Sequence, residues 1–151
     1  MWDKIVKYLS AAGGAVLSFF SGLPPLIWVL LATMSLDYFT GLMCAARGVS
    51  NKSETGHLSS RAARDGLLKK CMIFVVVLLA ALVDYAVTIG AGVEFSAVTG
   101  ACCLWFIASE GISIVENAAG LGVPIPAVLR RALEIMQDKG QGKAPTDNEQ
   151  E

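Results

Sequence analysis

The stretch that decides the fold is residues 71–92, CMIFVVVLLAALVDYAVTIGAG, which directly follows the paired lysines Lys69 and Lys70. A helix of about 20 residues rises about 30 Å, which matches the hydrocarbon core of a bilayer. The stretch carries no charge before Asp84. A buried helix of a soluble protein is usually shorter and shows a polar stripe. The stretch therefore predicts a membrane span.

The composition of the chain agrees with this prediction. Of its 151 residues, 54% are hydrophobic and 17% are charged, which is too apolar for an ordinary soluble domain. We expect an all-α integral membrane protein with three or four membrane helices and a C-terminal amphipathic helix. The expected single membrane domain is residues 1–138, with helices at about 4–22, 26–46, 66–91, 95–118 and 124–138. The polar residues 139–151 are expected to form a disordered tail.

The first and last predicted helices are less apolar than the three between them. Lys7 interrupts the apolar run of the first helix, which is either an amphipathic helix at the membrane interface or a first span. The last helix follows Pro124 and Pro126 and has a narrow apolar face. We expect this face to lie on the cytoplasmic membrane surface or against the basic connector. The face comprises Ile125, Val128, Leu129, Ala132, Leu133 and Met136.

The basic residues predict the topology. Two of the twelve Lys and Arg residues precede Tyr8, six lie between Arg47 and Lys70, and four follow Pro126. Four crossings place all of them on one side of the membrane, as the positive-inside rule requires, and both termini are then cytoplasmic. Three crossings would leave Lys4 and Lys7 outside, so four crossings are favoured. The side chains expected to contact anionic headgroups are Arg61, Arg64, Lys69, Lys70, Arg130 and Arg131.

Several polar side chains stand in or beside the predicted spans. Ionisable groups in a membrane are costly and usually mark function, so we expect them to serve assembly or to face an aqueous lumen. For Asp84 and Glu116, which lie near predicted span ends, simple hydration at the membrane interface is an equal alternative. Asp37 and Glu110 have no Lys or Arg within a predicted span. They should therefore be protonated, hydrated, or hydrogen-bonded to neighbours such as Ser109, Thr40 or Asn117. The candidates are Asp37, Asp84, Glu110, Glu116 and Asn117.

Other kinds of site are not indicated. His57 is the single histidine, and the four cysteines lie in or at the edge of apolar runs, so neither a metal site, a cofactor nor a disulfide framework is expected. No nucleophile can be combined with a catalytic base, and an enzyme is not expected. The basic connector lacks interleaved aromatic residues, so lipid headgroups and not nucleic acid are its expected partners.

Specific residues also resemble a known family, the phage holins that include the toxin-secretion/phage-lysis holins of Gram-positive bacteria and their phages. The resemblance runs from about Leu36 to Met136, and its most specific part is the stretch EGISIVEN at residues 110–117 with the G-x-P-x-P pattern that follows it. The residues that carry it are Asp37, Thr40, Gly41, Ser60, Gly66, Leu67, Lys69, Lys70, Glu110, Ser113, Ile114, Glu116, Asn117, Gly122, Pro124 and Pro126.

The resemblance implies a multi-pass protein of the bacterial cytoplasmic membrane that forms homo-oligomers. It also implies lesions that release a cell-wall hydrolase (endolysin) or a toxin and so cause host cell lysis. Two alternatives remain open from the residues: a small ion channel or transporter subunit using Asp37 and Glu110, and an antiholin-like membrane regulator that oligomerises without permeabilising.

Overall fold

The computed structural model describes residues 2–21, 24–50, 56–57 and 59–142, and this part of the chain is all-helical, as predicted. The proposed tail lies outside the described residues from 143 onward. The last helix extends two residues further than predicted, to Gly140. The helices are α1 (Trp2–Ser21), α2 (Pro25–Ala46), α3 (Ser60–Ala91), α4 (Ala97–Gly120) and α5 (Ala127–Gly140).

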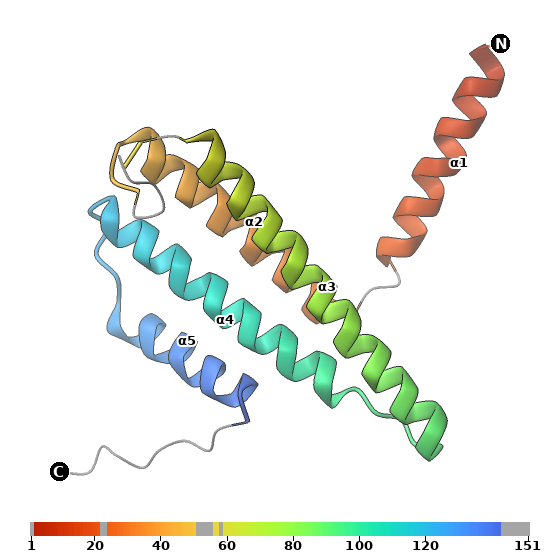
Figure 1. Ribbon diagram of the computed structural model, residues 1–151. Coiled ribbons are helices and arrows are strands. Elements are labelled where there is room, and N and C mark those ends of the chain that lie inside the picture. The colour runs from red at the N-terminus through yellow and green to blue at the C-terminus, as the bar shows by residue number, and fades with distance from the viewer. Residues whose placement is uncertain (1, 22–23, 51–55, 58, 143–151) are drawn as a thin grey trace.

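The central element is α4. It packs against α2 and α3 on one side and against α5 on the other, while α2 and α3 touch each other much less (Figure 1). Of the described helices, α1 packs against none and projects away from the bundle (Figure 1). Any site shared by α2 and α3 is therefore built largely through α4.

Local sequence sets where these helices begin and end. Pro25 occupies the first turn of α2, where a missing backbone N–H costs nothing. The Ser59 hydroxyl accepts a hydrogen bond from the Ala62 amide at 3.5 Å and so caps the start of α3. Gly92 ends α3 with φ of 68°, a left-handed conformation that glycine adopts at little cost.

The core forms where apolar stripes of three helices meet. Each stripe recurs at three- or four-residue intervals, which keeps its members on one face of the helix. The buried members are Ile27, Leu30 and Met34 of α2, Ile73 and Val77 of α3, and Cys103 and Ile107 of α4. Met136 of α5 packs against the same cluster.

Three helices, α2, α3 and α4, are long and apolar enough to cross a membrane. At 1.5 Å per residue, the 32 residues of α3 measure about 48 Å, so its first turns extend beyond a hydrocarbon core of about 30 Å. α1 is long enough to cross, but its first two turns contain Lys4 and Lys7 and it is not among the three. The described residues thus give three spans, and the preference for four finds no support in them.

The position of α5 differs from the prediction. It turns back and packs along α4, instead of lying on a membrane surface or against the connector (Figure 1). Leu133 and Met136 are partly covered, but Val128 of the predicted face is 81% exposed and Leu129 is 46% exposed. The actual contact face is rotated towards Gln137 and Gly140, because Gly140 allows the backbones of α4 and α5 to approach closely: a Cβ on it would lie 2.6 Å from the Trp105 Cβ.

Candidate functional site

The stripes that build the core also carry charged residues into it. Asp37 follows Met34 by three positions on α2, and Glu110 follows Ile107 by three positions on α4. Lys70 precedes Ile73 by three positions on α3. Because these spacings keep the charged residues on the packed faces, all three point towards the centre of the bundle.

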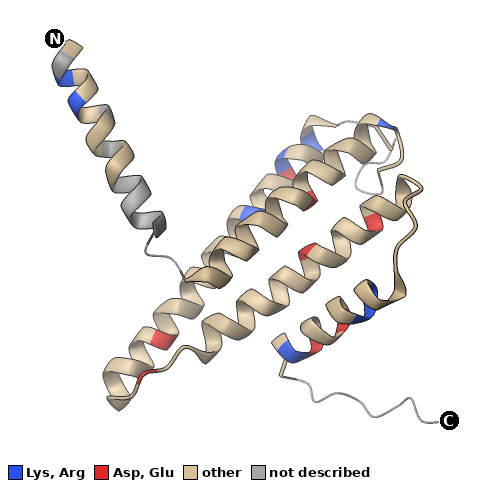
Figure 2. Ribbon diagram, turned by 180° about the vertical axis from the view of Figure 1, so that it is seen from behind, with Lys and Arg blue, Asp and Glu red and all other residues tan. Residues whose placement is uncertain are grey.

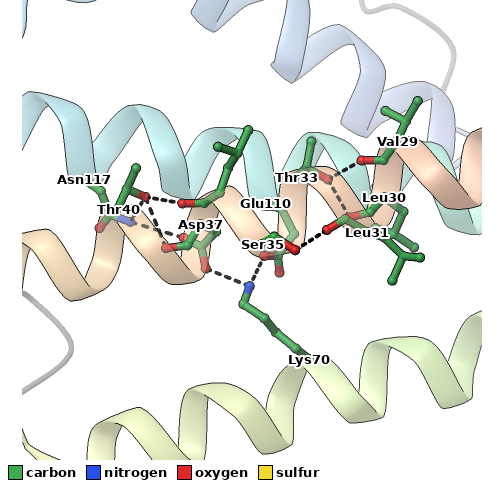
Figure 3. Close-up of polar contacts among 11 residues, drawn as sticks. Val29, Leu30, Leu31, Thr33, Ser35, Asp37, Thr40, Lys70, Glu110 and Asn117 are labelled. Carbon is green, nitrogen blue, oxygen red and sulfur yellow. Dashed lines mark hydrogen bonds and ion pairs between the residues drawn. The ribbon is translucent and has the colours of Figure 1, made fainter. Parts of the chain in front are cut away.

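The Lys70 ammonium bridges two carboxylates from different helices (Figure 3). Its Nζ donates to Asp37 Oδ2 at 2.9 Å and also donates to Glu110 Oε2. The three side chains are only 11%, 8% and 6% exposed, in the order Lys70, Asp37 and Glu110. We call these three residues the charge cluster; it joins α2, α3 and α4 at one point.

Asn117 extends the polar contacts towards the end of α4. Its side-chain amide donates to Asp37 Oδ1 at 3.2 Å and to Thr40 Oγ1 at 3.1 Å (Figure 3). The Cys44 thiol donates to the Asn117 backbone carbonyl at 3.2 Å. The predicted hydrogen bond between an intramembrane acid and Asn117 is therefore present.

The electrostatic consequence is that the two acids share one cation. Burying an isolated carboxylate is strongly unfavourable, whereas an ion pair with further hydrogen bonds offsets most of that cost. The expectation that Asp37 and Glu110 lack a basic partner was wrong, since Lys70 reaches both. The signal was in the sequence: Lys70, but not Lys69, is in register with the buried stripe of α3, and Lys69 is exposed.

A cleft of about 610 Å³ opens beside the charge cluster. Its lining includes Asp37, Lys70 and Glu110 together with His57 and Ser59 of the connector. Glu116 also lines the cleft but is exposed, unlike Glu110. The EGISIVEN stretch thus contains two acids in different surroundings.

The remaining basic candidates, on α3 and α5, are exposed. Arg61, Arg64 and Lys69 are exposed on the first turns of α3, and Arg64 lies 3.7 Å from Asp65 in an exposed ion pair.

In residues 2–21, 24–50, 56–57 and 59–142, no three His, Cys, Asp or Glu side chains converge as metal ligands would.

Asp84 performs a separate structural task at the far end of α3. It is buried, and its carboxylate accepts hydrogen bonds from the Val98 amide at 3.1 Å and the Thr99 amide at 2.8 Å. These are among the first amides of α4, which have no partner within their own helix. Asp84 therefore caps α4 from the neighbouring helix and fixes the turn between the two.

We expect Asp84→Leu to destabilise the protein by about 1–2 kcal/mol, the usual cost of losing a helix cap, and Asp84→Asn to cost less because one oxygen can still accept. Unfolding of the purified protein in detergent measures both effects. Thr88→Val is the control, because it removes the second bridge of the same turn, from Thr88 Oγ1 to the Phe95 amide, and leaves the cap. Equal stability of Asp84→Leu and the unsubstituted protein would contradict the capping role.

Comparison with known proteins gives a consistent result. The pattern of the Bacteriophage holin family matches residues 14–138, which include every residue of the charge cluster. An uncharacterised protein of Halalkalibacterium halodurans is 35% identical over 89% of this chain and 96% of its own length. A protein named a probable holin, from Bacillus phage phi105, is 33% identical over 80% of this chain and 81% of its own. No solved structure matches the chain.

Proposed function

Because the chain belongs to the bacteriophage holin family, we propose that it acts as a holin and catalyses no reaction. In this proposal it oligomerises in the cytoplasmic membrane of a bacterial host. The oligomer opens lesions through which an endolysin, or a toxin in a secretion system, leaves the cytoplasm. Access of the endolysin to the cell wall then lyses the host.

The charge cluster is the observation that carries this proposal. A holin must accumulate in the membrane before it opens, so its intramembrane acids need partners within each copy. Lys70 supplies that partner for Asp37 and Glu110. Polar groups in lipid favour helix association whenever the partner is on another copy, so exchange of these contacts between copies offers a route from monomer to assembly.

The orientation that we propose places the connector and the C-terminus in the cytoplasm, since ten of the twelve basic residues lie there. Single cysteines at Thr55, Val93 and Pro145, in a chain whose own cysteines are replaced, test it with a membrane-impermeant maleimide on intact cells. Only Val93→Cys should be labelled before lysis. Labelling of Thr55→Cys or Pro145→Cys would show that the orientation is the reverse. In a fourth variant, Trp2→Cys, labelling would show that α1 does not cross the membrane.

Release of solutes of increasing size from liposomes tests the proposal against its rivals. The purified protein should release ions, small dyes and folded proteins alike, without saturation. An ion channel or transporter subunit would release only ions or one class of solute, and an antiholin-like regulator would oligomerise without release. Either outcome would overturn the holin assignment.

A further inference from the structure

The placement of α5 creates a difficulty for a protein in lipid. Its 14 residues, about 21 Å, run back along α4 from the end that follows Gly120. A Cβ on Gly111 would lie 2.6 Å from Leu133 Cδ2, and Gly140 lies against the backbone of Trp105. Gly111 and Trp105 are in the middle of α4, so α5 reaches the same depth as the buried Glu110.

The outer surface of α5 is charged at this depth. All five of its ionisable side chains are exposed, and Figure 2 shows both basic and acidic residues along it. They are Arg130, Arg131, Glu134, Asp138 and Lys139. On insertion scales a charged side chain near the centre of a membrane costs about 2.5–3.5 kcal/mol, so this surface cannot face lipid while α5 is packed on α4.

The opposite flank of the bundle has the reverse character. The outward residues of α3 include Leu78, Leu79 and Leu82, and no charged residue lies between Cys71 and Val83. This flank suits lipid. The bundle as a whole is therefore amphipathic, with an apolar wall on α3 and a charged wall on α5, separated by α4 (Figure 2).

We propose that α5, packed on α4, lines the aqueous lumen of the assembled lesion with its charged face, while α3 faces lipid. The proposal rests on the proposed function, because a lumen requires that the protein permeabilises. In this arrangement the charged wall faces water. α5 is too short to span the membrane, and lining the lumen gives it a role that does not require spanning. The exposed apolar residues beside the charges, Val128 and Ile135, then face the neighbouring copy.

A cross-link that holds α5 on α4 tests this directly. A Cβ on Gly111 would lie 3.6 Å from Leu133 Cγ, close to where the sulfur of Leu133→Cys would be. The double variant Gly111→Cys/Leu133→Cys, without the four native cysteines, should therefore form a disulfide on oxidation in liposomes. The oxidised protein should release dye as the cysteine-free parent does. Activity that is lost on oxidation and restored by reduction would mean that α5 must leave α4, and the proposal would be wrong.

A labelling experiment on the locked protein separates the remaining alternatives. Because a thiol reacts as the thiolate, which needs water, Asp138→Cys on α5 should react about tenfold faster with a charged thiosulfonate than Leu82→Cys on α3. Equal, slow reaction at both positions would indicate that α5 is buried between copies, which overturns the proposal. Failure of the unsubstituted protein to release dye would instead refute the holin assignment.

Discussion

Lys70→Met should destabilise the bundle more than any other single substitution at the site. Methionine retains the apolar length of lysine, but it leaves Asp37 and Glu110 buried without their cation. Removing one partner of a buried ion pair typically costs about 3–5 kcal/mol. Unfolding of the purified protein in mixed detergent should show this loss, and the variant should fail to lyse cells.

Two controls separate the charge cluster from a general effect of losing a lysine. Lys69→Met removes an adjacent but exposed charge and should change stability by no more than about 0.5 kcal/mol. The triple variant Lys70→Met/Asp37→Asn/Glu110→Gln removes all three charges and should recover much of the stability, because neutral replacement of a whole buried ion set is often tolerated. Normal stability of Lys70→Met alone would show that the cluster contributes nothing.

The second large effect is expected at Glu110, with Glu116 as its matched control. Glu110→Leu removes a charge-assisted hydrogen bond to the buried Lys70, which is worth about 1.5–3 kcal/mol, whereas Glu110→Gln keeps an acceptor and should cost less. Glu116 is exposed, so the free energy of unfolding of its Gln and Leu variants should differ by no more than about 0.5 kcal/mol from that of the unsubstituted protein. Lysis timing should follow the same order. Equal effects of Glu110→Leu and Glu116→Leu would mean that the burial of Glu110 is irrelevant.

Much of this architecture could be predicted from the sequence. The apolar runs indicated the three spans, and Pro124 and Pro126 indicated that the last helix begins after them. Local signals of this kind act within a few residues of where they are read. For the same reason Asp37 and Glu110 could be selected as costly intramembrane acids before any partner was known.

The partners themselves depend on how helices pack, which a single run of sequence does not contain. Asp37 and Lys70 are 33 positions apart, and Lys70 and Glu110 are 40 apart. To predict the role of Lys70, one must know how the buried stripe of α3 is aligned with those of α2 and α4. The position of α5 was missed because its amphipathic pattern fits a membrane surface and a helix partner equally well, and close packing at Gly140 decides for α4.

We propose that this protein opens the membrane widely enough for a folded enzyme to pass. Expression in a bacterium, with and without a cell-wall hydrolase that has no export signal of its own, measures this directly. We expect abrupt lysis only when both proteins are present, and no lysis when the Lys70→Met variant replaces the unsubstituted protein. Continued growth of cells that contain both proteins, with the hydrolase active but retained in the cytoplasm, would contradict the proposal.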